Sequence, residues 1–290
     1  MKTSFYPLVV AAVLCIPMWA AGQPQDTADE QFPFQVKGAK PLEVLMNVDA
    51  GELIVEKGTE AASGVVNVKY FKDEYRAKVS FEEKENRLRI RLDKDDWTDI
   101  KHNENDDEGH WARVHVVLPH GVDVLFDARL KAGECVMNVG GLRFREFVLS
   151  TWAGKTEVRF DEPNAIPMDD LEINAKVGET RLLKLGNARF KEASVNGGIG
   201  EMNVDFSGEL EKDCRAKVDL DIGEATVRLP KAVGIRLHIG GSMGFLSHKS
   251  IDESFTKRGR YYYTDDYEDN ARKVYVLVTP GLGELNIERE

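Results

Sequence analysis

The strongest pattern in the chain is an alternation of apolar and polar residues that restarts at regular intervals. The restarts follow glycines that lie 21, 24, 22, 23 and 21 residues apart, namely Gly133, Gly154, Gly178, Gly200, Gly223 and Gly244. An apolar residue stands two places after four of these glycines and four places after five of them, as Met202 and Val204 do after Gly200. A period of two predicts strands with one buried face, and the recurring unit of about 22 residues predicts a solenoid.

Each glycine is predicted to lie where the chain turns into a strand. There a positive φ or the close approach of another backbone segment excludes a side chain. A second alternating run precedes the glycine, most clearly from Cys214 to Ile222 before Gly223. Two strands per rung, stacked on neighbouring rungs, predict two facing sheets around one core. No segment has a helical period, so the predicted fold is an all-β solenoid.

The predicted solenoid domain covers residues 33–290. Residues 33–130 contain less regular strands, residues 131–248 form the regular rungs, and residues 249–290 supply a closing loop and strands. Residues 1–22 are typical of a cleaved signal peptide, with an apolar run and small residues at Ala20 and Gly22. The alternative is an uncleaved membrane anchor. Residues 23–32 are polar and lack a period, which predicts a flexible leader.

The net charge and the cysteine content limit the kinds of partner that the protein is expected to bind and the disulfides that it can form. The net charge of -11 becomes -12 when Lys2 leaves with the signal peptide, which disfavours nucleic acid and anionic lipid as partners. Cys135 and Cys214 are the cysteines left after cleavage, and the repeat places them at least three rungs apart, roughly 14 Å at the spacing of strands. A disulfide needs α-carbons within about 7 Å, so we expect no bridge.

We also expect no membrane span after cleavage of the signal peptide, because no later segment is long and apolar enough. Because a signal peptide directs export, the expected location is outside the cytoplasm, either periplasmic or extracellular.

Turn and strand motifs recur along most of the chain, in the stretches 114–119, 132–134, 160–164, 199–208 and 222–230. These motifs resemble those of the toast-rack family of "putative adhesin" domains, which includes relatives of the LiaF-type cell-wall-active antibiotic response proteins. The resemblance extends from about Val36 to Ile287. It implies an extracytoplasmic β-solenoid, usually without an assigned activity and sometimes associated with envelope stress sensing.

The sequence offers few groups for catalysis or metal binding. Its six histidines form no close pair at metal-ligand spacing, and no nucleophile elbow, phosphate loop or metalloprotease motif occurs. The acidic stretches 93–97 and 103–109 could offer oxygen ligands to calcium, but they lack the EF-hand spacing. The glutamates that follow the glycines could form a carboxylate ladder that recruits cations, or could simply face water. We expect no catalytic residue, metal or cofactor.

The segment from Ser254 to Asn270 interrupts the repeat with tyrosines and mixed charges. Such residues favour a recognition surface. The candidate partner-binding residues are Arg260, Tyr261, Tyr263, Asp265, Asp266 and Tyr267. The alternative is that the tyrosines pack onto the last rung as a cap.

The predicted function is that of a non-catalytic, secreted envelope protein with a structural, adhesive or stress-related role. Its expected partner is an envelope protein or a glycan. Two alternatives remain: a ligand- or cation-binding module of the cell surface, and a carbohydrate-active β-solenoid enzyme. The enzyme would need charged side chains clustered on one face of consecutive rungs, and the outward residues Glu157, Asn203 and Thr226 share no acid pair.

Overall fold

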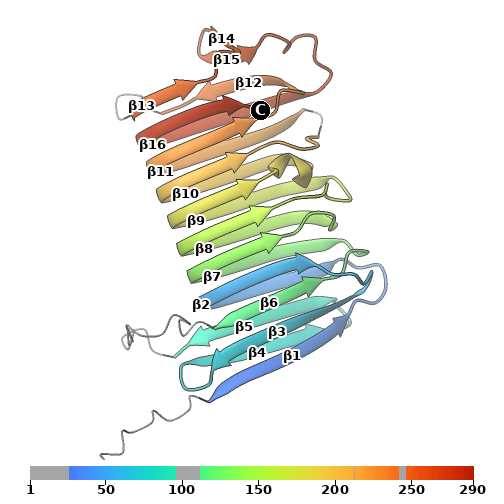
Figure 1. Cartoon of the computed structure of the whole chain (residues 1–290). Coiled ribbons are helices and arrows are strands. Elements are labelled where there is room, and N and C mark those ends of the chain that lie inside the picture. The colour runs from blue at the N-terminus through green and yellow to red at the C-terminus, as the bar shows by residue number, and fades with distance from the viewer. Residues whose placement is uncertain (1–25, 96–111, 212, 242–245) are drawn as a thin grey trace, which may run out of the picture.

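The computed structural model describes residues 26–95, 112–211, 213–241 and 246–290. Its central feature is a stack of long strands that pair in parallel, each in register with the next (Figure 1). In spatial order these strands are β2 (Leu42–Lys57), β7 (Val124–Asn138), β8 (Phe144–Arg159), β9 (Met168–Leu183), β10 (Phe190–Asp205), β11 (Cys214–Leu229) and β16 (Lys273–Arg289). A short 3-10 turn, η1 (Leu185–Ala188), follows β9. The predicted all-β solenoid is confirmed.

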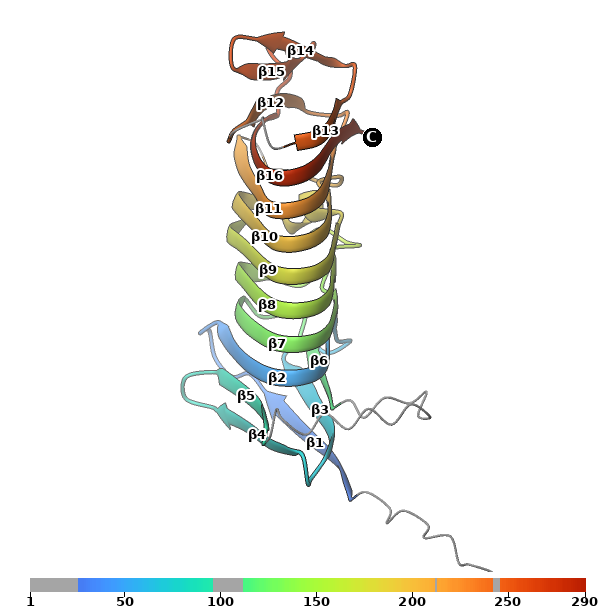
Figure 2. The ribbon, with the colours of Figure 1, turned by 90° about the vertical axis from the view of Figure 1, so that its left-hand side faces the viewer.

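Each long strand bends at its glycine, so that its two halves face each other across the core (Figure 2). The pairing continues through the bend, where Gly223 lies opposite Gly200 on one side and Gly283 on the other. At Gly223 φ is 136°, and a Cβ atom there would overlap the carbonyl oxygen of Gly200. The positive φ and the close approach of a neighbouring backbone segment therefore both exclude a side chain at this position, as expected.

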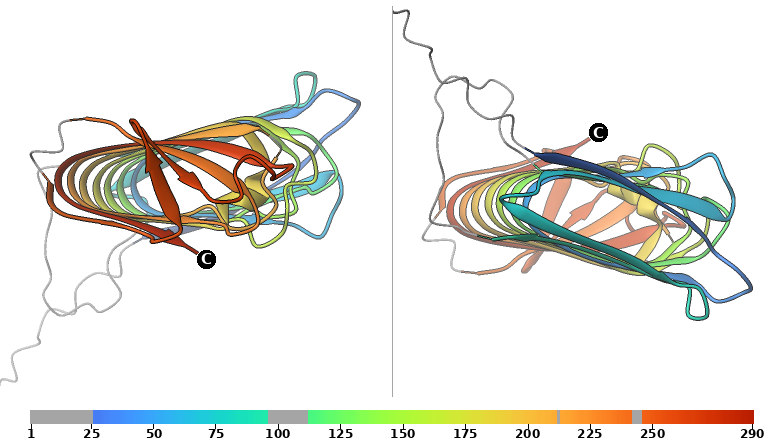
Figure 3. Two further views of the ribbon diagram at one scale, coloured as in Figure 1. Left: turned by 90° about the horizontal axis from the view of Figure 1, so that it is seen from above. Right: turned by 90° about the horizontal axis from the view of Figure 1, so that it is seen from below.

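The two strands predicted for each rung are thus two halves of one continuous strand. We call the halves before the glycines the first arm of the sheet and the halves after them the second arm. Seen along the stack, the rungs superpose as a flattened U around the core (Figure 3). The two facing sheets are one sheet folded along its line of glycines.

The core lies between the two arms. The residues four places after the glycines are fully buried, namely Val55, Met137, Val158, Leu182, Val204, Val227 and Ile287. Phenylalanines fill the wider part of the core near β7 and β8, where the rings of Phe126 and Phe147 stack with centroids 5.0 Å apart. The alternation in the sequence therefore identifies the buried face correctly.

The N-terminal end is more regular than expected. β2 lies within the part predicted to be irregular, yet it is a full rung with Gly51 opposite Gly133. Between β2 and β7 the chain makes a detour that forms β3 (Ser63–Phe71), β4 (Tyr75–Glu82), β5 (Arg87–Lys94) and β6 (Arg113–Leu118). β5 pairs with the first half of β2 and β6 with the second half, and β4 and β3 then extend the two arms.

The prediction of a flexible leader over residues 23–32 is wrong from Thr27 onward. Thr27–Gln35 forms β1, which pairs antiparallel with β3 and buries Ala28 and Phe34. The ring of Phe34 lies 5.4 Å from that of Phe81 in β4, so this contact joins the two arms. The segment is ordered by a partner strand far along the chain rather than by its own composition. Residues 1–25, including the predicted signal peptide, lie outside the described residues.

At the C-terminal end the spatial order of the strands differs from their order in the sequence. The repeat predicted that the rung of Gly244 would follow that of Gly223, but Gly223 lies opposite Gly283 of β16. β12 (Gly234–Ile239) pairs with the first half of β16, and β13 (Leu246–Ile251) pairs with the second half. β15 (Tyr261–Thr264) and β14 (Phe255–Arg258) then extend the first arm. Residues 242–245 lie outside the described residues.

Both cysteines are free and buried, which confirms that they do not bridge. Cys135 lies on β7 and Cys214 on β11, with β8, β9 and β10 between them. Burial raises the pKa of each thiol to about 12. The part of the chain that is described contains no helix long and apolar enough to cross a membrane.

Candidate binding face at the C-terminal end

Two rows of outward side chains cross the C-terminal strands of the first arm. The first row consists of Glu192, Arg215, Tyr275, Arg236 and Tyr263, in register on β10, β11, β16, β12 and β15. The second row consists of Ser194, Lys217, Leu277, His238 and Tyr261 on the same strands. The residues between the two rows, such as Ala216, Val276 and Leu237, are buried in the core. We call the surface formed by both rows the C-terminal face.

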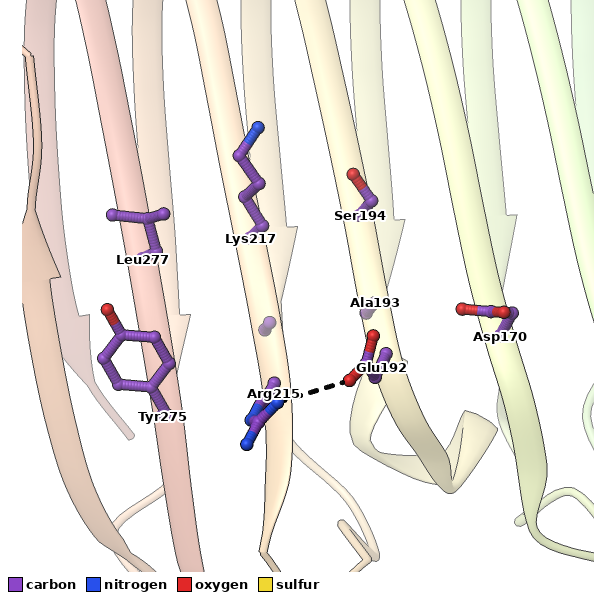
Figure 4. A pocket seen from close by; sticks show the side chains of 9 residues that line it. Asp170, Glu192, Ala193, Ser194, Arg215, Lys217, Tyr275 and Leu277 are labelled. Carbon is purple, nitrogen blue, oxygen red and sulfur yellow. Dashed lines mark ion pairs between the residues drawn. The ribbon is translucent and has the colours of Figure 1, made fainter.

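A shallow groove of about 280 Å³ lies across the start of this face. Figure 4 shows its main side chains, which are Asp170, Glu192, Ser194, Arg215, Lys217, Tyr275 and Leu277. Arg215 forms an ion pair of 3.5 Å with Glu192 on the neighbouring strand. The groove therefore has an acidic side on β9 and β10 and a basic side on β11.

Tyrosine rings continue the C-terminal face beyond the groove. The ring of Tyr261 lies 5.2 Å from that of His238 and 6.2 Å from that of Tyr263, which in turn lies 5.1 Å from Tyr267. Tyr262 points to the other side of β15, where it lies opposite Leu237 and packs against the core. The cap interpretation therefore describes Tyr262, whereas the other three tyrosines form an outward row.

Basic side chains lie over these rings. The guanidinium of Arg236 is 4.7 Å from the ring of Tyr275 and 5.4 Å from that of Tyr261. Arg258 lies 5.5 Å from Tyr263, and Arg260 lies 5.8 Å from Tyr261. Cation–π attraction holds such groups over the ring without using their N–H donors. Nε of Arg236 is buried and has no hydrogen-bond partner in the described part of the chain.

These arginines differ from those in the rest of the described chain. Each arginine from Arg76 to Arg228 forms an ion pair with an aspartate or glutamate. After Arg228 no arginine forms an ion pair with a described residue; these are Arg236, Arg258, Arg260, Arg272 and Arg289. The C-terminal end therefore carries arginines that are not held in an ion pair with a described carboxylate.

Carboxylates near these arginines are bound by neutral groups instead. Asp265 accepts a hydrogen bond of 3.2 Å from the Thr256 hydroxyl, and Asp266 accepts one of 2.9 Å from the Asn270 amide. Partial burial alone would raise the pKa of Asp266, but hydrogen bonds from Asn270 and Thr264, together with the charge of Arg289, outweigh it and hold the pKa below its ordinary value. Both aspartates of the predicted site thus lie in the turn after β15 without pairing to its arginines.

The structure brings Arg260, Tyr261, Tyr263 and Tyr267 of the predicted site together. It adds residues that the sequence analysis missed, chiefly Arg215, Arg236 and Tyr275. Alternation marks each of these as outward on its own strand. Their proximity depends on the insertion of β16 between β11 and β12, for which the sequence contains no local signal.

Among the described residues, the other candidate groups form no cluster suited to a metal ion. The glutamates after the glycines lie one rung apart, as the pairing of Glu179, Glu201 and Glu224 shows. No group of three His, Cys, Asp or Glu residues in the described ranges is arranged to hold a metal ion. Asp93 and Asp95 of the first acidic stretch form ion pairs with arginines, and residues 96–111 lie outside the description.

An exposed apolar column lies along the bend, where the sequence analysis made no prediction. It consists of the residues just before four glycines, which are 42–53% exposed: Val177, Ile199, Ile222 and Leu282. They lie opposite one another on β9, β10, β11 and β16. The bend itself turns them outward, because a strand that reverses around a glycine exposes the residues on its convex side.

Comparison with known families gives two consecutive matches. Residues 21–165 and 163–228 match the family described as the N-terminal domain of toast_rack, DUF2154. The chain belongs to the toast-rack family. The resemblance seen in the strand and turn motifs is thereby confirmed. The match ends at the last residues of β11, so it does not include β12, β15 or β16 of the C-terminal face.

Solved structures resemble the chain only loosely. A "putative cell adhesion protein" from Clostridium sporogenes is 17% identical, with 91% of this chain and 100% of the other covered and a TM-score of 0.44. A "putative adhesin" from Bacteroides fragilis is 8% identical, with 91% and 98% covered and a TM-score of 0.38. Likenesses of this kind carry no argument about function. None of the curated proteins matches the chain.

Proposed function

We propose that this toast-rack protein is an exported, non-catalytic protein of the bacterial envelope that binds a partner through its C-terminal face. The observation that carries the proposal is the contrast between arginines. Elsewhere they pair with carboxylates, whereas here Arg236, Arg258 and Arg260 lie over tyrosine rings without an ion pair. Arginine and tyrosine are the residue types in which binding energy usually concentrates.

The structure of the rungs supports a role as a scaffold for this face. The stack presents the face on strands whose positions are held by hydrogen bonds along their whole length and by a continuous core. Rigid elements of this kind lower the entropy that a binding surface loses when it is occupied. Adhesive, structural and stress-related roles in the envelope all require such a surface, and the expected partner is an envelope protein or a glycan.

The groove contains two neighbouring carboxylates, which bears on the enzyme alternative. Asp170 and Glu192 lie opposite each other on the neighbouring strands β9 and β10, and glycosidases use a pair of carboxyl groups. Both are exposed to solvent, and Arg215 forms an ion pair with Glu192. A glycosidase needs one carboxyl group that stays protonated in a partly dry site, so this pair favours binding over hydrolysis.

A recovery experiment tests the proposed function. The tagged full chain is incubated with bacterial envelope fractions, and bound components are compared for wild type, Tyr261→Ala, Tyr263→Ala and Tyr267→Ala. Arg91→Ala serves as the control, because Arg91 is an exposed arginine on β5 at the other end of the stack. We expect the tyrosine variants to recover less partner while melting close to the wild-type temperature. Equal recovery by all five proteins would contradict the proposal.

A further inference from the structure

We propose that the C-terminal face binds an anionic glycan, with its acidic groups on Arg236, Arg258 and Arg260 and its sugar rings on the outward tyrosines. This inference rests on the proposed function, because it names the class of ligand for the same face. It adds the groove side chains of Arg215 and Tyr275 to the binding residues. Four steps lead to it.

The first step concerns charge. The protein carries a net charge of -11, so its long-range field repels most anions. Within that field Arg236, Arg258 and Arg260 lie on or beside the C-terminal face without an ion pair to a described carboxylate, while the nearby Asp265 and Asp266 are bound by a hydroxyl and an amide. A local positive surface of this kind is complementary to a ligand with discrete negative groups.

The second step concerns geometry. A guanidinium that lies over an aromatic ring keeps its N–H donors free at its edge. These donors match the two oxygens of a carboxylate or phosphate and bind them in a bidentate manner. Arg258 and Arg260 are exposed, and Arg236 lies between the rings of Tyr261 and Tyr275. The arginines are therefore held in place before the ligand arrives, which lowers the entropic cost of binding.

The third step concerns the tyrosines. Tyr261, Tyr263 and Tyr275 are each partly exposed. Tyr261 and Tyr263 stand on β15 and Tyr275 stands on β16, with β12 between the two strands. Aromatic rings pack against the C–H face of a sugar, and the phenol hydroxyl offers a hydrogen bond to its hydroxyl groups. From β11 to β15 the face extends over three strand spacings, about 14 Å. It is long enough for more than one sugar ring of an extended chain.

The fourth step distinguishes a glycan from other anions. Nucleic acid carries a dense row of charges, and the carboxylates of Asp170, Glu192 and Asp265 border this face. A protein partner usually inserts a large side chain into a deep apolar pocket, whereas the groove here is shallow and most of the residues that line it are charged or polar. A glycan with widely spaced acidic groups can avoid the carboxylates that border the face, and it needs no deep apolar pocket.

The test measures binding of the full chain to defined polymers by affinity electrophoresis. The probes are polygalacturonate, which carries carboxylates, a phosphomannan, which carries phosphates, a neutral mannan, and a single-stranded oligothymidylate. We expect at least one of the two acidic polymers to bind about tenfold more tightly than the neutral mannan, and the affinity to fall with added salt. The two acidic polymers distinguish carboxylate from phosphate as the recognised group.

Variants connect this binding to the face. The double variant Arg258→Gln/Arg260→Gln is expected to lose about tenfold in affinity, and Tyr261→Ala a similar amount. The matched control is Arg89→Gln/Arg91→Gln, which removes two exposed arginines from β5. Because Arg258 and Arg260 are exposed and form no ion pair, their replacement should leave the melting temperature unchanged.

Three results would overturn the inference. They are equal binding of acidic and neutral polymers, binding of oligothymidylate as tight as that of the acidic glycans, and equal losses in the face variant and the control. If the acidic glycans fail to bind while the tyrosine variants still lose an envelope partner, the glycan class is wrong and the proposed function stands. If the tyrosine variants also recover the partner normally, both fail.

Discussion

The N-terminal and C-terminal ends of the stack are closed by the same device and differ in their side chains. At each end the chain leaves the stack, builds short strands that extend the two arms, and returns to add a full rung. At the N-terminal end the arginines of β5 pair with acids, as Arg87 does with Glu43. At the C-terminal end Arg236 and Arg258 lie over tyrosines instead.

Comparing the two ends shows which side chains are needed to close the solenoid and which are not. A solenoid end must stop the addition of further strands and cover the core, and paired charges on short strands achieve both. The described residues of the N-terminal end close the stack without exposed tyrosines or unpaired arginines. The extra chemistry of the C-terminal end is therefore unnecessary for closure, which favours a role in binding.

The largest expected effect contrasts a glycine of the stack with one at the C-terminal end. In Gly223→Val the new side chain would overlap the Gly200 carbonyl at a positive φ, so we expect the free energy of unfolding to fall by about 3 kcal/mol or more. Gly259 also has a positive φ, of 63°, but its Cβ would meet nothing within 4 Å, so Gly259→Ala should cost only about 1 kcal/mol. Urea unfolding measures both, and equal losses would show that contact between rungs does not restrict Gly223.

A smaller effect separates closure from binding within the C-terminal end itself. Tyr262 packs against the core, so Tyr262→Ala should lower the free energy of unfolding by about 2 kcal/mol. Tyr263 points outward on the adjacent position, so Tyr263→Ala should lower it by less than about 1 kcal/mol. Thermal unfolding compares the two. A larger loss for Tyr263→Ala would mean that the outward row is structural after all.

A paired arginine site near the N-terminal end should depend on pH. Asp123 accepts hydrogen bonds of 2.9 Å from Arg143 and 2.7 Å from Arg145. Partial burial alone would raise the pKa of Asp123, but the two arginines outweigh it and hold the pKa below its ordinary value. The site therefore stabilises the fold above the unfolded pKa of about 3.9, and this contribution is lost as the pH falls through the lower folded value.

We accordingly expect Asp123→Asn to lower the free energy of unfolding by about 1 kcal/mol at pH 7. The difference from wild type should stay the same down to about pH 5 and shrink at pH 3 and below. Urea unfolding at pH 7, 5 and 3 measures it. A difference that grows as the pH falls would contradict the assigned direction of the pKa shift.

The smallest expected effect concerns the exposed column along the bend. The side chain of Ile222 is 42% exposed, so Ile222→Ser should change the free energy of unfolding by no more than about 0.5 kcal/mol. The matched variant Val227→Ser, on the same strand but fully buried, should cost several times more. Similar losses in the two variants would show that the column is covered in solution.

The sequence by itself determined the local parts of this protein. Alternation identified the buried residues of each rung, such as Met202 and Val204, because the two faces of a strand differ at every second position. The spacing of the glycines predicted the repeat, because only glycine fits a bend that stacks on another bend. Both signals lie within a few residues of the feature that they predict.

Only the tertiary structure decided which strand lies beside which at the two ends. The polar strand β1 is held by β3, and β16 enters between β11 and β12, which brings Arg215, Tyr275 and Arg236 side by side. The edge of a rung offers the same row of N–H and C=O groups whatever its side chains are, so no local pattern states which segment will pair with it. The candidate site consists of contacts across such edges, and for this reason it became visible only when the strands were in place.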